Sequence, residues 1–185
     1  MISFESDDRI EKVIEYAIYW DYDIEHLYEL EHVWIYVGRD SSVINCECSF
    51  HGKYFKGLLK DRSNIAEDKP TQVKLYSQPG KHAFSPLITL LELVPNLDTC
   101  TYETAGRGGL LVPDMLRDKM TADDLTNQLV ERYLQTLRFR PSMEFIEYAW
   151  DDDSLFVTWP ELLEEIPQRV NQELAKIREF FSISG

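Results

Sequence analysis

The sequence predicts an α+β protein, in which an antiparallel β-sandwich in the N-terminal half carries helices from the C-terminal half packed on it. Two observations predict this class. Segments rich in β-branched and aromatic residues fill the first part of the chain, and leucines at helical spacing fill the last part. With 185 residues and 44% hydrophobic content, the chain is long and apolar enough to form a single packed domain, residues 1–185.

Strands are expected in the N-terminal half at residues 13–20, 33–37, 43–50 and 73–76. The sequence GRDSS at residues 38–42 lies between two of these segments and predicts a hairpin turn. Polar and apolar residues alternate along 43–50, so one face of that strand is expected to pack and the other to be polar. Residues 60–70 are polar and are expected to form a loop.

Helical features begin after this sheet region. Residues 121–124, TADD, resemble a capping box with Asp in place of Glu, and they precede leucines at helical spacing. This helix is expected to end before Pro141, and residues 142–148 are expected to form one more strand.

A second helix is expected to start at residues 158–161, TWPE, with Glu at its third helical position. Pro167 is expected to kink or restart it. The apolar stripe that follows predicts a core-facing side formed by Val170, Leu174, Ile177 and Phe181.

The charge of the chain restricts its partners. Acidic residues outnumber basic ones by 33 to 19, for a net charge of −14. Such a surface repels phosphate backbones and anionic lipids, so neither nucleic acid nor a membrane is expected as a partner. Cations, a small molecule or a basic protein partner fit this charge. No apolar run approaches the roughly 20 residues of a membrane span.

The cysteines and the N-terminus predict a compartment. Cys46, Cys48 and Cys100 form no CxxC pair, and they are expected to be reduced thiols, buried in the core. Residues 1–11 are polar and acidic, unlike a secretory signal. A cytoplasmic location is therefore expected.

The clearest chemical signal is the stretch WDYDIEHLYELEHVW at residues 20–34. Imidazole and carboxylate groups gathered in this way suit a divalent cation, namely Mg²⁺, Ca²⁺, Mn²⁺ or Zn²⁺. Residues two apart in an extended segment face the same side, so Glu29 and Glu31 are expected to converge with His26, whereas His32 faces the other way. The alternative is a solvated acidic turn in which His26 pairs with a neighbouring carboxylate.

Two further features could contribute to a pocket. His82 follows Pro79 and Gly80, and is expected in a turn. Residues 105–114, AGRGGLLVPD, are expected to form a flexible surface loop, with an anion-binding nest or a lid as alternatives. In the last case Arg107 would face an anionic substrate.

The segment around His26 resembles the GHRHDWE signature of the necrosis- and ethylene-inducing-like proteins, and the related HEGDWE motif of a fungal vacuolar protein-sorting family. In this resemblance the first metal-binding histidine of the motif falls on His26, its aspartate on Glu29 and its glutamate on Glu31. Leu30 stands where the motif has tryptophan, and the leading glycine is absent.

Two later motifs of these families have counterparts in this chain, in the same order along the sequence. A strand that ends in Ser, His and Gly corresponds to residues 49–52, SFHG, and a Gly-Ser/Thr-His element corresponds to Gly80 and His82. The resemblance covers roughly residues 16–86. It implies a β-sandwich with a divalent cation at one end, held by His26, Glu29 and Glu31 with His51, and an upstream aspartate that is either Asp21 or Asp23.

Two classes of function follow. One is a metal-dependent enzyme, a hydrolase in which the cation activates water. The other is a non-catalytic acidic binding protein, similar to the small bacterial immunity proteins that neutralise a toxin, in which the cation is structural or absent. An open coordination position would favour the first class, and strong salt sensitivity of partner binding the second.

Overall fold

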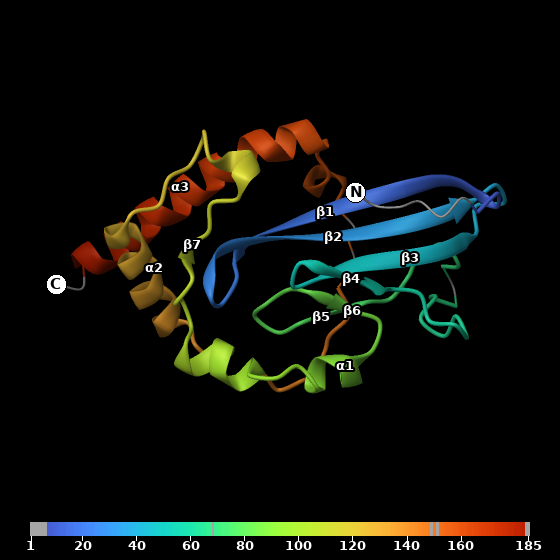
Figure 1. Ribbon diagram of the computed structural model, residues 1–185, viewed down its shortest axis with the longest axis horizontal. Coiled ribbons are helices and arrows are strands. Elements are labelled where there is room, and N and C mark those ends of the chain that lie inside the picture. Colours follow the sequence, from blue (N-terminus) through green and yellow to red (C-terminus); the bar gives the residue numbers. More distant parts are fainter. Residues whose placement is uncertain (1–6, 68, 149, 151, 184–185) are drawn as a thin grey trace. The chain divides into compact units, whose positions relative to one another are not determined.

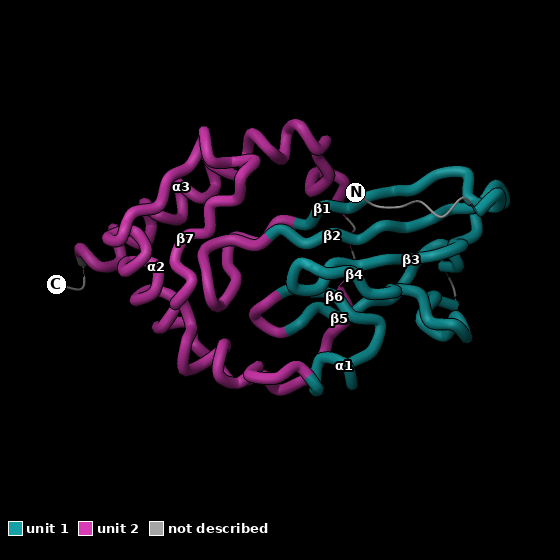
Figure 2. The backbone as a smooth tube through the Cα atoms, viewed as in Figure 1, with its two compact units in different colours: residues 1–18, 30–78, 82–93 teal, residues 19–29, 79–81, 94–185 magenta. Residues whose placement is uncertain are grey.

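The computed structural model describes residues 7–67, 69–148, 150 and 152–183 (Figure 1). Their contacts group into two compact units (Figure 2). Unit 1 comprises the described residues of 1–18, 30–78 and 82–93, and unit 2 those of 19–29, 79–81 and 94–185. Strands fill the N-terminal half and helices the C-terminal half, which confirms the predicted α+β class. That the chain forms one domain stays a prediction.

The main sheet has the strand order β1-β2-β3-β4, with β7 paired to β2. Its strands are β1 (Ile10–Tyr22), β2 (His26–Gly38), β3 (Val43–Phe50), β4 (Lys53–Lys56) and β7 (Gly109–Leu110). The pairs β2–β3 and β3–β4 are antiparallel, whereas β7 is parallel to β2. The strands β5 (Tyr76–Ser77) and β6 (Phe84–Ser85) form a separate antiparallel ladder, which is the second sheet among the described residues.

The expected hairpin turn joins β2 to β3. The Gly38 N–H donates to the carbonyl of Ser42 at 2.9 Å. In the register that this turn sets, Val33 lies opposite Cys48. Cys46 and Cys48 are fully buried free thiols, as predicted. Since burying an apolar side chain contributes about 1.5–3 kcal/mol, this packed face stabilises unit 1.

The strand predictions hold for three segments and fail for the fourth. Segments 13–20 and 33–37 lie inside β1 and β2, and 43–50 coincides with β3. Of residues 73–76, only Tyr76 belongs to a strand. Asn64 explains the difference, because its Nδ2 donates to the Lys74 carbonyl at 3.1 Å and its own carbonyl accepts from the Lys74 N–H at 2.7 Å. These bonds hold the segment against a loop.

The helices are α1 (Ile88–Glu92) in unit 1, and α2 (Asp124–Thr136) and α3 (Trp159–Ile183) in unit 2. Short turns of π or 3₁₀ geometry form η1 (Thr99–Glu103), η2 (Asp114–Leu116) and η3 (Asp153–Leu155). The N-cap of α2 is Asp123, whose carboxylate accepts from the Thr126 N–H at 2.7 Å. The predicted box with Thr121 as its cap is therefore wrong, since the cap lies two residues further on.

The start of α3 is as predicted. The Glu161 carboxylate accepts from the Thr158 N–H at 2.8 Å and from its hydroxyl at 2.7 Å. The helix runs through Pro167 without a break, so it does not restart there. The predicted core stripe is confirmed, with Val170, Leu174 and Ile177 buried and Phe181 partly buried. Among the described residues, no helix combines the length and the apolar character that crossing a bilayer requires.

Residues 142–148 form no strand, so that prediction is wrong. A strand requires a neighbour to pair with its backbone. Here Ile146 is 93% exposed and Tyr148 is 68% exposed. These two apolar side chains of the expected strand therefore face solvent.

Candidate functional site

The turn between β1 and β2 brings three of the candidate ligands together. Asp23, His26 and Glu29 each offer a nitrogen or oxygen atom, and these atoms lie within 4.8 Å of one another. Among the described residues this is the one group of at least three histidine, cysteine or acidic side chains with such spacing. All three belong to unit 2.

Short-range hydrogen bonds shape this turn. The Asp23 N–H donates to the His26 carbonyl at 3.1 Å, which closes the turn. The Asp23 Oδ1 accepts from the Glu25 N–H at 2.7 Å. Aspartate favours such local bonds to the backbone two residues on, so the sequence Asp-Ile-Glu folds readily into this shape.

Neighbouring segments of unit 2 hold the turn in place. The Ile24 N–H donates to the Gly80 carbonyl, the Gly106 N–H to the Ile24 carbonyl, and the Gly108 N–H to the Glu25 carbonyl, each at 2.7 Å. Figure 1 shows β7 beside the start of β2, where His26 pairs with Gly109. The amides of the glycine-rich loop are thus bonded to the turn, and this loop supports the candidate ligands.

The imidazole of His26 is oriented for binding at one nitrogen. Its Nδ1 lies 2.8 Å from the Tyr28 carbonyl, so Nδ1 carries the proton that it donates there. The Nε2 then lies 3.5 Å from Glu29 Oε2 and 3.7 Å from Asp23 Oδ1. A histidine that ligates a metal commonly has its other nitrogen bonded to a carbonyl in this way.

Asp23 is the most enclosed member of the group. Its side chain has no exposed surface, and its Oδ1 also accepts from Lys81 Nζ at 2.8 Å. Lys81 pairs with Glu25 Oε2 at 2.9 Å as well. Burial tends to lower the pKa of Lys81, but the two carboxylates outweigh it and raise that pKa above its usual value. Lys81 therefore neutralises part of the acidic turn.

One buried oxygen of the cluster has no hydrogen-bond partner among the described residues. This is Oδ2 of Asp23, the carboxylate oxygen that Lys81 does not contact. A buried carboxylate oxygen without a partner is costly, since water no longer solvates it. A cation bound at the cluster would remove this cost.

The expected convergence of Glu29 with Glu31 is not found. Tyr28 has a φ of +53°, which interrupts the alternation of an extended strand. Glu29 therefore lies on the same side as His26, whereas the buried Glu31 accepts a hydrogen bond from the Ser49 hydroxyl in unit 1. Burial and the charge of Glu29 raise the pKa of the Tyr28 phenol, which stays neutral.

The other candidate residues lie outside this cluster. Asp21 is partly buried on β1. His51 is exposed and its Nε2 lies 2.7 Å from Gln78 Oε1. The His82 N–H donates to the Gln78 carbonyl in the β5–β6 turn, and the Arg107 N–H to the Thr104 carbonyl.

Sequence reasoning missed two parts of the site, Lys81 and Gly108. Lys81 follows Asp23 by 58 residues, and no local pattern connects them. A Cβ on Gly108 would lie 2.9 Å from the Glu25 carbonyl oxygen and 3.0 Å from His26 Cβ, so glycine is required for the close approach. The run of glycines was the available signal, and its role as a support depends on the tertiary contact.

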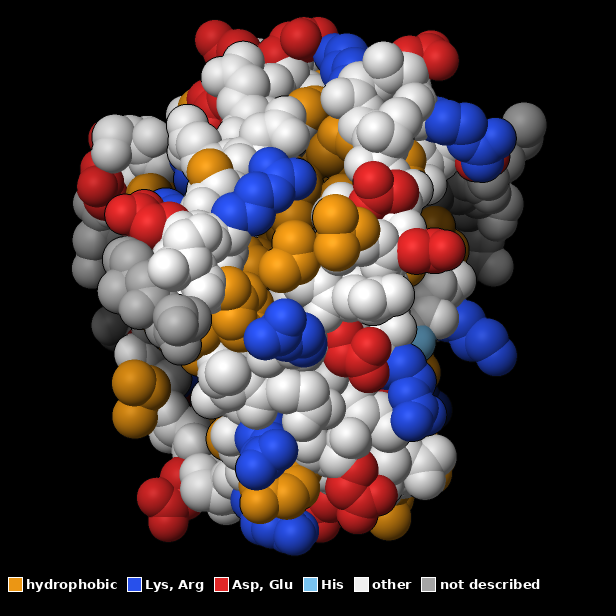
Figure 3. Space-filling model, turned by 90° about the vertical axis from the view of Figure 1, so that its left-hand side faces the viewer, with side chains coloured by type: hydrophobic (Ala, Val, Ile, Leu, Met, Phe, Trp, Pro, Cys, Tyr) orange, Lys and Arg blue, Asp and Glu red, His pale blue; other side chains and the backbone are white. Residues whose placement is uncertain are grey.

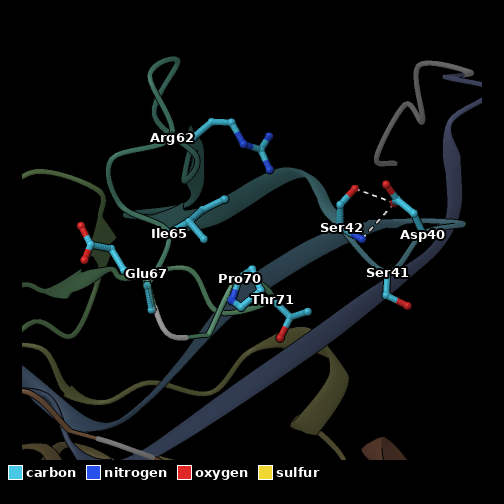
Figure 4. A pocket seen from close by; sticks show the side chains of 9 residues that line it. Asp40, Ser41, Ser42, Arg62, Ile65, Glu67, Pro70 and Thr71 are labelled. Atoms are coloured by element: carbon cyan, nitrogen blue, oxygen red, sulfur yellow. Dashed lines mark hydrogen bonds between the residues drawn. The ribbon is translucent and has the colours of Figure 1, made fainter.

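A separate open hollow of about 660 Å³ lies in unit 1, beside the β2–β3 turn (Figure 4). Three of its polar side chains are bonded to the chain itself. Arg62 donates to the Val43 carbonyl at 2.7 Å, and Asp40 Oδ1 accepts from the N–H and hydroxyl of Ser42 at 3.0 and 2.7 Å. The hollow lies in unit 1, whereas the acidic turn with its three clustered ligand atoms lies in unit 2.

The surface is not acidic throughout. On one face, hydrophobic side chains gather in a band that has both basic and acidic side chains along its border (Figure 3). The net charge of −14 therefore conceals local differences. Where a charged partner binds depends on the face that it meets.

Comparison with known protein families, with curated proteins and with solved structures finds no match to this chain. The resemblance to the necrosis- and ethylene-inducing-like proteins stays a prediction. The candidate site is consequently argued from its own geometry.

Proposed function

We propose that Asp23, His26 and Glu29 bind a divalent cation. The observation that carries the proposal is the convergence of one imidazole nitrogen and two carboxylates within 4.8 Å, at a turn that other segments of unit 2 hold in place. Metal–ligand bonds of about 2.0–2.2 Å put neighbouring ligand atoms about 3–3.5 Å apart. The distances of 3.5 and 3.7 Å around His26 Nε2 are near this spacing.

The donor set favours some ions over others. One nitrogen and two oxygens, without a thiolate, suit Zn²⁺ or Mn²⁺ better than Ca²⁺, which prefers six to eight oxygens. Three protein ligands leave a coordination position for water or a substrate. A bound Zn²⁺ would lower the pKa of its water to about 7, so hydrolysis is the reaction class that the site supports best.

Lys81 sets a limit on the affinity. Its ammonium already occupies Oδ1 of Asp23 at 2.8 Å. An incoming cation must share that oxygen or use Oδ2, and it meets the positive charge of Lys81 in either case. We therefore expect weaker binding than at a site built of ligands alone.

Metal titration tests the proposal directly. Untagged protein, treated with a chelator, is titrated with Zn²⁺, Mn²⁺, Mg²⁺ and Ca²⁺ by calorimetry, and its melting temperature is followed in parallel. One equivalent is expected to bind. Glu29→Gln should fold normally, because Glu29 is partly exposed, and should weaken binding by at least about 100-fold.

His51→Ala is the matched control, since it removes an exposed histidine outside the cluster. It should leave the titration unchanged, whereas His26→Ala should abolish it. Binding of none of the four ions, or equal binding by wild type and Glu29→Gln, would contradict the proposal. If a cation binds, hydrolysis of aryl esters and aryl phosphates by loaded and chelator-treated protein tests the reaction class.

A further inference from the structure

Residues 141–168 differ from the rest of the chain in composition. This acidic apolar segment contains eight aspartates and glutamates and no lysine, arginine or histidine. The whole chain has a net charge of −14, so more than half of this excess lies within a short part of it. The described residues of the segment belong to unit 2, and none of them is part of the cation cluster.

Large apolar side chains of the segment are exposed. Ile146 is 93% exposed, Tyr148 68% and Trp150 47%. Beyond the acidic run, Leu155 is 51% exposed and Val157 43%. Isolated exposed apolar residues are ordinary, but several of them in one short segment mark an interaction surface.

Seven of these eight acidic residues are among those that the structure describes, and they divide into two sets. Glu161 caps α3, Glu164 pairs with Lys119, and Glu165 lies 3.4 Å from Arg169. These three serve the fold or are neutralised. The second set consists of exposed carboxylates that lie along the chain among the exposed apolar side chains: Glu144, Glu147, Asp153, and Asp152, which also accepts from the Ser154 N–H at 2.9 Å.

We infer that this segment is a docking surface for a basic protein segment that presents apolar side chains between lysines or arginines. Charge complementarity carries the choice of partner, because the exposed carboxylates of Glu144 and Glu147 lie on either side of the exposed Ile146 along the chain. Aromatic and aliphatic side chains with a charged rim are the usual composition of the centre of an interface. A second copy of this chain is disfavoured, since two copies of charge −14 repel each other.

Model peptides provide the test. The probes are three 20-residue peptides: an amphipathic peptide of leucine and lysine, its counterpart with glutamate for lysine, and one of serine and lysine. Binding to the full chain is followed by anisotropy of a label on each peptide. Only the leucine–lysine peptide is expected to bind at physiological salt, and its affinity should fall as salt rises.

Two variants separate the apolar from the charged contribution. Ile146→Ser with Tyr148→Ser should weaken binding at least about tenfold, as expected for central apolar contacts. Glu144→Gln with Glu147→Gln should weaken it and reduce the dependence on salt. The matched controls are Leu93→Ser, at a side chain 77% exposed outside the segment, and Glu92→Gln, at an exposed carboxylate, and both should bind as wild type does.

Several results would overturn the inference. They are equal binding by the segment variants and the controls, equal binding of the serine–lysine peptide, or no binding at all. A lower melting temperature in Ile146→Ser with Tyr148→Ser would show that the chain itself covers the segment. A dimer in sedimentation that this variant dissociates would assign the surface to a second copy, and equal binding to zwitterionic lipid vesicles would assign it to a lipid surface.

Discussion

Lys81 Nζ lies 2.8 Å from Oδ1 of Asp23, and neither side chain is more than 7% exposed. A buried pair of this kind contributes little compared with apolar residues of similar volume, but removing one partner leaves a buried charge uncompensated. Lys81 therefore has two roles in the geometry. It compensates Asp23, and it occupies part of the position where a cation would bind.

Lys81→Met tests both roles. Without added metal, we expect the free energy of unfolding to fall by about 3–5 kcal/mol, because Asp23 and Glu25 lose their cation. If the cluster binds metal, Zn²⁺ or Mn²⁺ should then raise the melting temperature more in this variant than in wild type, since the ammonium no longer competes for Oδ1. Urea unfolding and melting temperatures with and without metal measure these effects.

Lys56→Met is the control for that experiment. Lys56 also pairs with a carboxylate, that of Glu47 at 3.3 Å, but its own side chain is 68% exposed and that of Glu47 is 24% exposed. Exposed pairs contribute about 0–1 kcal/mol, so a small change is expected, and the metal response should match wild type. A Lys81→Met protein as stable as wild type would show that the buried pair does not form.

Gly108→Ala tests the support that the glycine-rich loop gives to the turn. The added Cβ would lie 2.9 Å from the Glu25 carbonyl oxygen, so the backbone of one segment must shift. We expect a loss of about 1–3 kcal/mol of stability and weaker metal binding, because the ligands move with the turn. Gly52→Ala is the control: its φ of +73° is strained for alanine, but no atom lies within 4 Å, so the metal response should be unchanged.

The sequence predicted the parts of the site that are close together along the chain. Asp23, His26 and Glu29 lie within one turn and the start of a strand, so composition alone drew attention to them. The grouping was wrong at Glu31, because regular alternation was assumed through Tyr28. A non-glycine residue with a φ of +53° is not predictable from its identity.

The parts that depend on distant contacts were not predictable. Lys81 reaches Asp23 across 58 residues. Residues 142–148 have the composition of a strand, but whether they pair depends on a neighbouring strand, which the local sequence does not specify. The start of α3, which depends on the local Thr158–Glu161 bond, was predicted correctly, whereas the cap of α2 was predicted two residues too early.

Substitutions at two residues test the N-cap of α2: Asp123, which caps the helix in the structure, and Thr121, which the sequence predicted as the cap. Asp123→Ala should lower the melting temperature, because the Thr126 N–H loses its acceptor, whereas Thr121→Ala should not. Hydrogen bonds from Thr126 hold the pKa of Asp123 below its usual 3.8. The contribution of the cap is therefore present above about pH 3.8 and is lost as the pH falls through the folded-state pKa.

Thermal unfolding from pH 7 to pH 2 measures this contribution. The difference between wild type and Asp123→Ala should shrink as the pH falls. Asp123→Asn keeps an acceptor without a titrating charge, so its difference from wild type should not follow the same curve. Equal melting temperatures of wild type and Asp123→Ala at pH 7 would mean that another group caps α2.

The buried thiols of β3 make the stability of the protein depend on pH in the alkaline range. Burial raises the pKa of both Cys46 and Cys48 to about 12. The neighbouring Cys48 adds to the increase for Cys46, and Glu31 adds to the increase for Cys48. Cys48 also donates to the Phe84 carbonyl at 3.3 Å. Because these folded-state pKa values are raised, their stabilising contribution is complete below about pH 9 and is lost as the pH rises toward 12.

Reaction with an aromatic disulfide reagent at pH 8 tests this environment. Because burial raises the pKa of Cys46 and Cys48 to about 12, few of these thiols ionise at pH 8. Their modification should be on the order of 10³-fold slower than in protein unfolded in urea. Cys100, which is partly buried with a pKa raised to about 11, should react faster than either. Cys46→Ser and Cys48→Ser identify the slow thiols. Rapid modification of all three cysteines in folded protein would show that β3 is open to solvent, because only exposed thiols ionise near their ordinary pKa.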